Sequence, residues 1–187
     1  MWPRLFVDGT YSILVSTDRS YARVHAQFLT YAPFFDGCIG ALDGTHIKVS
    51  VNKDAKRDYI NRKGDVTINV CAIVDMDMRF TFVGARMAGS VHDMAILREC
   101  WREPTFPHPP QGCYYLVDVG YALETGYMGS FKNTRYHLDD FRGIDMETLS
   151  RQEKLNFTHS SLHNIVERTF GVLKGRWHIL DGVPVLP

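Results

Sequence analysis

The sequence of 187 residues has no excess of charge of either sign, because 21 basic residues balance 21 acidic ones. Domains that bind DNA on their own often carry a clear positive excess, since neutralising phosphates and releasing counterions drives their affinity. The balance therefore argues against strong autonomous DNA binding. It does not exclude an enzyme of nucleic-acid chemistry, because catalytic carboxylates offset basic patches in the count and a partner can hold the DNA.

Long apolar runs and paired cysteine motifs are also missing. No apolar run approaches the ~20 residues that a membrane-spanning helix needs, and the first residues lack the layout of a signal peptide, so we expect an intracellular protein without membrane association. The four cysteines form no C-x-x-C pair, which argues against a zinc knuckle or a redox motif. They can pair as two disulfides, but Cys38 and Cys71 stand in apolar, strand-like runs, which favours buried thiols.

The rest of the composition is that of a globular protein, with 45% hydrophobic and 22% charged residues. Its length predicts one domain with a substantial core. Residues 1–30 form a poorly defined N-terminal segment with a weak helical pattern over 20–30. We expect residues 31–187 to form the folded core.

Apolar alternation predicts most of the strands. A strand pair or one bent strand is expected over 38–51, with a kink or bulge near Asp43, and a hairpin over 66–88 turns at residues 75–78. A helix over 93–101, with Asp93 as its cap, precedes a proline-rich loop. Further strands are expected over 114–117 and 127–131. This order predicts an α/β fold with a mixed sheet.

The last predicted helix spans residues 160–177 and begins near His159 with a serine cap. Its apolar stripe consists of Leu162, Ile165, Val166, Thr169, Phe170, Leu173 and Trp177. At about 100° per residue, Glu167 falls on the polar side together with His163, Gly171 and Lys174. Glu167 therefore stands beside the buried face, where it can reach a sheet edge.

Two aspartates stand at strand-associated positions, Asp43 in ALDGTHI and Asp118 in YYLVDVGY. Mg²⁺ prefers such oxygen ligands, and two ions about 4 Å apart can activate water and stabilise the leaving oxygen in phosphodiester cleavage. Glu167 would complete the site as a third carboxylate. Each residue also has an ordinary interpretation: the aspartates as turn residues, and Glu167 as an exposed helix residue paired with Arg168 or Lys174.

Five stretches in order resemble the PIF/Harbinger transposase superfamily, in particular its plant members and the nuclease-like proteins domesticated from them. They are GALDGTHI (40–47), AGSVHDMAIL (88–97), YYLVDVGY (114–121), KNTRYHL (132–138) and HSSLHNIVERTFGVLKGRW (159–177). The resemblance implies an RNase H-like fold with a mixed central sheet flanked by helices. It also implies a catalytic triad of Asp43, Asp118 and Glu167 that holds two Mg²⁺ or Mn²⁺ ions and cleaves DNA.

The resemblance gives other motif residues secondary roles. Lys132, Arg135, Arg168 and Lys174 are candidates for contacting DNA phosphates, and the basic residues of segment 53–63 either do the same or form a solvated face. For Asp93 a helix-cap role is favoured over a metal role. His46 is expected to be a strand residue near the site.

Three departures from the family pattern qualify this interpretation. His163 stands where the family often has arginine, the usual upstream helix-turn-helix-like region is absent, and family members continue past the glutamate helix. Residues 31–187 therefore resemble a C-terminally truncated catalytic core. The family implies a nuclear protein with a Myb-like DNA-binding partner and leaves an oligomer open. The alternative is a catalytically idle, domesticated protein that acts as a nuclear interaction scaffold.

Overall fold

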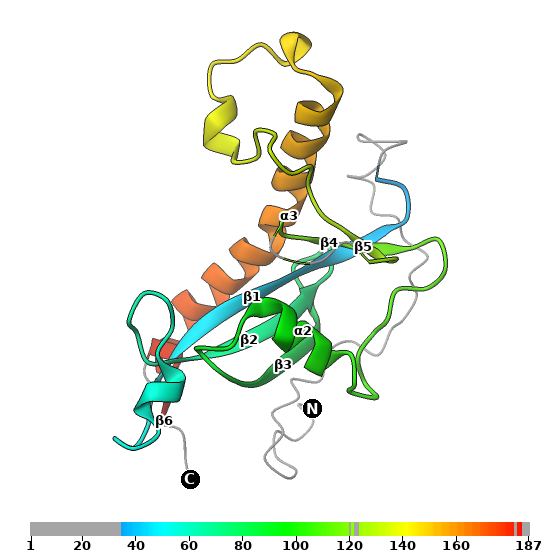
Figure 1. Ribbon diagram of the computed structural model, residues 1–187. Coiled ribbons are helices and arrows are strands. Elements are labelled where there is room, and N and C mark those ends of the chain that lie inside the picture. Colours follow the sequence, from blue (N-terminus) through cyan, green and yellow to red (C-terminus); the bar gives the residue numbers. More distant parts are fainter. Residues whose placement is uncertain (1–34, 120, 122–123, 182, 185–187) are drawn as a thin grey trace.

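The computed structural model describes residues 35–119, 121, 124–181 and 183–184. The N-terminal segment 1–30, with its weakly predicted helix, lies outside this range. The described chain forms a sheet between two principal helices (Figure 1), in the order of strands and helices that the sequence predicts.

The sheet is mixed, as predicted. Its main path runs β3-β2-β1-β4-β5, with strands β1 (Cys38–Ser50), β2 (Thr67–Val74), β3 (Phe80–Ala88), β4 (Tyr114–Val117) and β5 (Tyr127–Met128). β1 pairs antiparallel with β2 and parallel with β4, and β2 pairs antiparallel with β3. A short β6 (Val183–Pro184), which was not predicted, pairs in parallel with the end of β1. β5 is shorter than the predicted 127–131.

β1 is one continuous strand, and the predicted kink near Asp43 is wrong. Its pairing with β2 runs without interruption from Ala41 to Lys48. The irregularity lies earlier, between Cys38 and Gly40, where the register with β4 shifts. A Cβ at Gly40 would lie 2.4 Å from the carbonyl oxygen of Val74, so glycine is what permits this close approach.

The β2–β3 hairpin turns where the sequence predicts. The carboxylate of Asp75 accepts hydrogen bonds from the backbone N–H groups of Asp77 and Arg79, each at 2.9 Å. Met78 closes the turn at a φ of 60°, in the left-handed region that few residues other than glycine adopt. Local side-chain bonds of this kind stabilise the turn.

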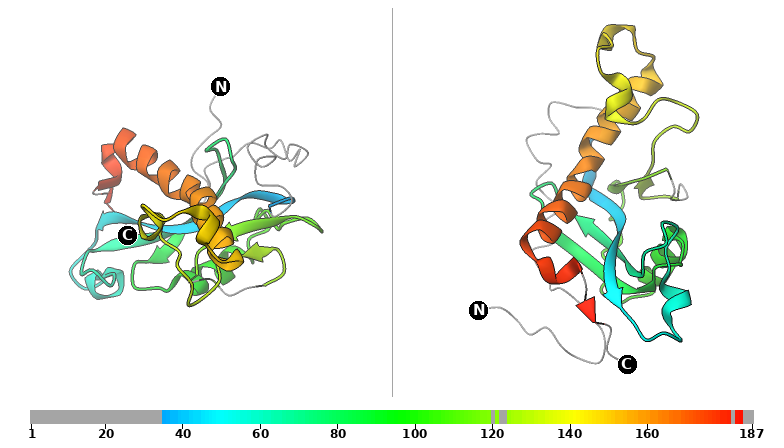
Figure 2. Two further views of the ribbon diagram at one scale, coloured as in Figure 1. Left: turned by 90° about the horizontal axis from the view of Figure 1, so that it is seen from above. Right: turned by 90° about the vertical axis from the view of Figure 1, so that its left-hand side faces the viewer.

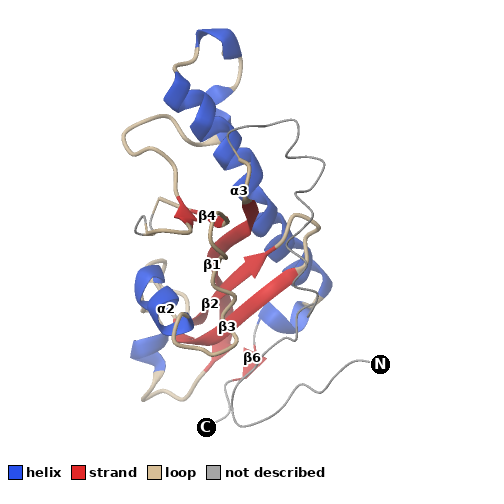
Figure 3. Cartoon of the chain, turned by 90° about the vertical axis from the view of Figure 1, so that its right-hand side faces the viewer, coloured by secondary structure: helices blue, strands red, loops and turns tan. Residues whose placement is uncertain are grey.

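Two helices cover opposite faces of the sheet (Figure 3). α2 (Asp93–Cys100) packs against the face that carries Leu42, Ile73 and Val117. α3 (Arg151–Arg176) packs against the face that carries Ala41 and Leu116. Neighbouring residues on a strand point to opposite faces, so the parity of a position decides which helix its side chain meets.

α3 begins nine residues earlier than predicted. Ser150 is its N-cap and forms a reciprocal capping box with Glu153. The helix ends before Trp177, which is 54% exposed, so the prediction that Trp177 belongs to the buried stripe is wrong. The first half of α3 projects beyond the sheet (Figure 1, Figure 2) and packs against the short helix η2 (Leu138–Phe141).

The remaining connections are irregular or form single turns: η1 (Lys56–Tyr59), η3 (Met146–Thr148) and η4 (His178–Asp181). All four cysteines are free thiols, and Cys38, Cys71 and Cys100 are buried, in agreement with the preferred prediction. Among the described residues, no helix is long and apolar enough to cross a membrane.

Candidate functional site

The parallel pairing of β1 with β4 places Asp43 and Asp118 next to each other. Leu42 and Val117 form the last pair of this ladder, and the two aspartates occupy the following position on each chain. Ala41 and Leu116, two residues earlier, face α3, so by strand parity Asp43 also faces that helix. The sheet therefore directs Asp43 toward the helix that carries Glu167, and Asp118 follows β4 at the adjacent position.

Glu167 is exposed on α3, beside Val166, which is fully buried against the sheet. The charges of Asp118 and Glu167 act electrostatically on Asp43. Burial raises the pKa of Asp43 to about 7, the N–H of Gly44 opposes the rise, and the negative charges of Asp118, Glu167 and Asp93 add to it. That N–H donates to Asp43 Oδ1 at 2.7 Å. The negative charges of Asp118, Glu167 and Asp93 thus all act on Asp43.

The donor chemistry of this group fits a hard divalent cation, since carboxylate oxygens are the ligands that Mg²⁺ and Mn²⁺ prefer. The pKa of Asp43 is raised chiefly by burial and further by the neighbouring carboxylates, and a bound cation would favour the charged form of this group. Within the described part of the chain, however, no three His, Cys, Asp or Glu side chains lie close enough together to hold a metal ion. The donor types fit, and the side chains are not gathered at ligating distance.

Two histidines of α3 tie the glutamate helix to the strands. The Nε2–H of His163 donates to the carbonyl oxygen of Leu42 at 3.2 Å, immediately before Asp43. His159 donates in the same way to Met128 at 2.9 Å, and the two rings stack with centroids 5.8 Å apart. Burial lowers both pKa values, that of His159 to about 4, so both rings are neutral near pH 7. The prediction that His163 lies on the polar side of the helix is wrong, because it is 2% exposed.

Asp93 does not cap α2 as predicted. His92 is the N-cap, and its side chain makes no capping hydrogen bond. The Asp93 carboxylate instead accepts a 2.9 Å hydrogen bond from the amide of Asn69 on β2. A Cβ built on Gly44 would lie 3.2–3.4 Å from Asn69 Oδ1, Asp93 Oδ1 and the hydroxyl of Tyr121. These oxygens therefore converge on the residue after Asp43, from the face opposite α3.

Sequence reasoning missed Tyr136, a residue of the loop before η2 that experiences the negative charges of the same three carboxylates. Burial raises the pKa of Tyr136, as do the negative charges of Asp118, Glu167 and Asp43. Its ring lies 5.7 Å from that of His159. The motif KNTRYHL contains Tyr136, and it was the only sequence signal for this residue.

The four predicted DNA-contacting residues lie in two places. Lys132 and Arg135 belong to a loop that Asn156 of α3 holds: its Oδ1 accepts from the N–H of Phe131 at 2.8 Å, and its Nδ2 donates to the carbonyl of Arg135 at 3.1 Å. Arg135 also pairs with Glu153 at 3.6 Å.

Arg168 is exposed on α3, next to Glu167. Lys174 is engaged with β1, because its Nζ donates to Thr45 Oγ1 at 2.7 Å and to the carbonyl oxygen of His46 at 2.8 Å. Lys174 thus links the end of α3 to the strand that carries Asp43. His46 is an exposed strand residue whose Nδ1 lies 2.9 Å from Thr67 Oγ1.

A family model described as DDE superfamily endonuclease matches residues 42–186. Among curated proteins, "Putative nuclease HARBI1" from Rattus norvegicus is 26% identical over 147 residues, and its Homo sapiens counterpart is 25% identical over 147. "Protein ALP1-like" from Arabidopsis thaliana is 26% identical over 165 residues. These matches cover 78–80% of this chain but only 38% of the length of each relative. No solved structure matches.

Proposed function

Because the chain belongs to the DDE superfamily endonuclease family, we propose that it is a catalytic core that cleaves phosphodiester bonds of DNA at Asp43, Asp118 and Glu167. The observation that supports this most directly is that the register of β1 and β4 puts Asp43 and Asp118 at adjacent positions, and that the negative charges of Asp118 and Glu167 act on Asp43. A group of negative charges at the rim of a sheet is destabilising unless a cation neutralises it.

In this proposal Asp43, Asp118 and Glu167 would hold two Mg²⁺ or Mn²⁺ ions, which would supply activation of water and stabilisation of the leaving oxygen. In the hydrolysis the oxygen of a water would bond to phosphorus, the bond between phosphorus and the 3′ oxygen would break, and a proton would pass to the 3′ oxygen. The products are a 3′ hydroxyl and a 5′ phosphate. In transposition the 3′ hydroxyl would then attack target DNA.

The chain's own residues position the reacting groups. The Gly44 N–H orients the Asp43 carboxylate, and His163 fixes α3 to the backbone just before it. A small displacement of such groups is costly for catalysis, since rates depend steeply on geometry. A Myb-like partner and a nuclear location stay predictions from the family resemblance.

The test is nicking of supercoiled plasmid DNA with Mg²⁺ or Mn²⁺, using the wild type, Asp43→Asn, Glu167→Gln and the control Asp140→Asn. Asp140 is an exposed carboxylate of η2. We expect nicking by the wild type and the control, and loss of at least about a hundredfold in either site variant. Nicking that persists in Asp43→Asn or Glu167→Gln, with both variants folded by circular dichroism, would contradict the assignment.

A second candidate function is a non-catalytic interaction module. It is favoured by exposed apolar side chains near the end of α3 and in η4, where Val172 is 60%, Trp177 54% and Ile179 67% exposed. Such side chains often mark an interface. Calorimetry with Mn²⁺ separates the two functions, since the nuclease requires the ion to bind and the interaction module does not.

A further inference from the structure

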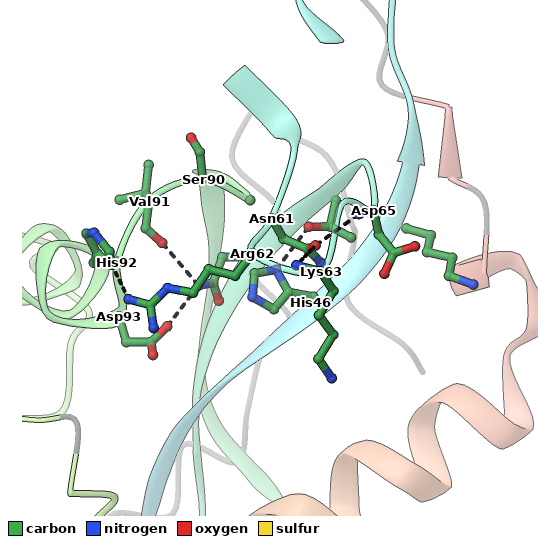
Figure 4. Close-up of a pocket in the computed structure, with 13 residues that line it drawn as sticks. His46, Asn61, Arg62, Lys63, Asp65, Ser90, Val91, His92 and Asp93 are labelled. Atoms are coloured by element: carbon green, nitrogen blue, oxygen red, sulfur yellow. Dashed lines mark hydrogen bonds between the residues drawn. The ribbon is translucent and has the colours of Figure 1, made fainter. Parts of the chain in front are cut away.

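A cavity of about 340 Å³ lies on the face of the sheet opposite α3. It is bounded by the turn at residues 61–65, the segment 89–93 that leads into α2, and side chains of β1 and β2 (Figure 4). We call it the basic pocket. His46 and Lys48 of β1, with Thr67 and Asn69 of β2, alternate along one face of paired strands and line the pocket together.

The charged groups of the basic pocket are mostly positive. Lys48, Arg62 and Lys63 line it, against the two carboxylates of Asp65 and Asp93. Arg62 is exposed, and its Nη2 donates to His92 Nδ1 at 2.7 Å across the pocket (Figure 4). An arginine with further N–H donors beside a lysine is the arrangement that recognises phosphate.

The buried side of the pocket holds a polar atom without a partner. Asn69 is 1% exposed, and its Nδ2 donates to Asp93 and to the carbonyl oxygen of Val91. Its Oδ1 is buried and has no hydrogen-bond partner among the described residues. Buried polar atoms are nearly always paired in native proteins, so this unpaired acceptor, which lies 3.2 Å from the position a Cβ of Gly44 would take, marks a polar inner wall between the pocket and the strand that carries Asp43.

The basic pocket is also connected to the carboxylate group. Asn69 and Asp93 reach Gly44, the residue after Asp43. β4 pairs with β1 only as far as Leu42, so within the described chain the β4 side of β1 has no neighbouring strand from Asp43 to Lys48. The carboxylate group and the basic pocket thus lie on opposite faces of the same stretch of β1, where Lys174 of α3 contacts Thr45 and His46.

We propose that the basic pocket binds one nucleotide of the DNA strand being cleaved, next to the scissile phosphate. The phosphate of this nucleotide contacts Arg62 and Lys63, and its base or sugar lies against Asn69 and Asp93, which line the pocket. The volume of about 340 Å³ is in the range of small-ligand sites. This inference rests on the proposed nuclease function, because it assigns the pocket to the same substrate.

The test measures binding of a fluorescein-labelled single-stranded oligonucleotide by anisotropy, in EDTA, so that no cleavage is required. Arg62→Ala with Lys63→Ala should weaken binding about tenfold, as expected when charge-assisted hydrogen bonds are removed. The slope of log K against log salt should also fall by about 0.7 for each phosphate that the variant no longer neutralises. If the two residues had a merely structural role, the slope would stay unchanged.

Asp65→Asn should have the opposite effect on the affinity for the oligonucleotide, because it removes a negative charge from the pocket. The backbone of Asp65, rather than its carboxylate, makes the hydrogen bonds of its turn, so the fold should survive and binding should tighten. The controls are Arg142→Ala and Asp140→Asn, which alter exposed charges of η2 and its C-cap. Deoxyadenosine monophosphate should displace the oligonucleotide at lower concentration than inorganic phosphate does.

Unchanged affinity in both pocket variants would overturn the proposal, and equal competition by inorganic phosphate would overturn its nucleotide part. Failure of the nuclease function gives a different result: no metal-dependent nicking by the wild type, whatever the anisotropy shows.

Discussion

Replacing Asp43 with asparagine should stabilise the metal-free protein above neutral pH. Burial and the nearby carboxylates raise the pKa of Asp43 from 3.8 to about 7, and each pKa unit corresponds to about 1.4 kcal/mol. The upper limit of the effect is therefore about 4 kcal/mol. Asp43 is partly exposed, and solvent screening reduces the expected gain to about 2 kcal/mol. Asparagine retains the oxygen that accepts the N–H of Gly44.

The direction of this stability change follows from the protons that the folded and unfolded states bind. Between pH 3.8 and about 7 the folded state keeps the Asp43 proton that the unfolded state releases, so the wild type loses stability as pH rises through this window. Below the unfolded pKa the stabilising contribution is fully present. The amide of the Asp43→Asn variant does not titrate, so its free energy of unfolding relative to the wild type should grow with pH and level off above about 7.

Urea denaturation in EDTA at pH 4, 5.5 and 8 measures this difference. The control Asp140→Asn should show no comparable growth, because Asp140 is exposed. Adding Mn²⁺ at pH 8 should raise the stability of the wild type and leave Asp43→Asn nearly unchanged. A stability difference independent of pH would refute the reasoning, because it would mean that Asp43 is not destabilised by its surroundings.

Three further predictions concern the packing around the site. His163→Leu should lower the free energy of unfolding by about 1–3 kcal/mol, because the buried Leu42 carbonyl loses its donor; urea denaturation measures this, and His163→Gln should recover part of it. Asn156→Ala should lower the free energy of unfolding by about 2 kcal/mol. It should also speed hydrogen exchange of the Phe131 amide, which donates to Asn156 Oδ1 at 2.8 Å, and unchanged exchange would count against this role of Asn156. Ser150→Ala should cost about 1 kcal/mol through loss of the capping box, seen as a lower melting temperature, whereas Ser161→Ala, an exposed mid-helix control, should not.

The parts of the fold that the sequence predicted are those with local causes. The β2–β3 hairpin follows from alternation and from turn residues that bond within four positions, as Asp75 does with Arg79. The register of β1 against β4 has no such local signal, because parallel strands pair across a long connection. The pairing of Leu42 with Val117 was therefore beyond sequence reasoning, although both aspartates were recognised.

Two errors concern polar residues that distant partners hold. His163 was assigned to the polar side of α3 by its angular position near Glu167, but it is buried and donates to an acceptor 121 positions away in the chain. Asp93 resembled a helix cap, but its carboxylate accepts from Asn69 on β2. The early start of α3 is a different kind of error, since Ser150 and Glu153 have the spacing of a capping box and were readable in the sequence.

The zero net charge, which argued against DNA binding, is compatible with a DNA substrate once the charges are placed in space. Asp43, Asp118 and Glu167 gather negative charge on the face toward α3, while Lys48, Arg62 and Lys63 line a pocket on the opposite face. Phosphate binding depends on the local potential at distances within about 10 Å, because salt screens charges that lie farther apart. A chain with no overall excess of cations can therefore hold phosphate at one place and repel it at another. The pocket would then hold a phosphate without metal, whereas the carboxylate face would accept one only when divalent ions neutralise it.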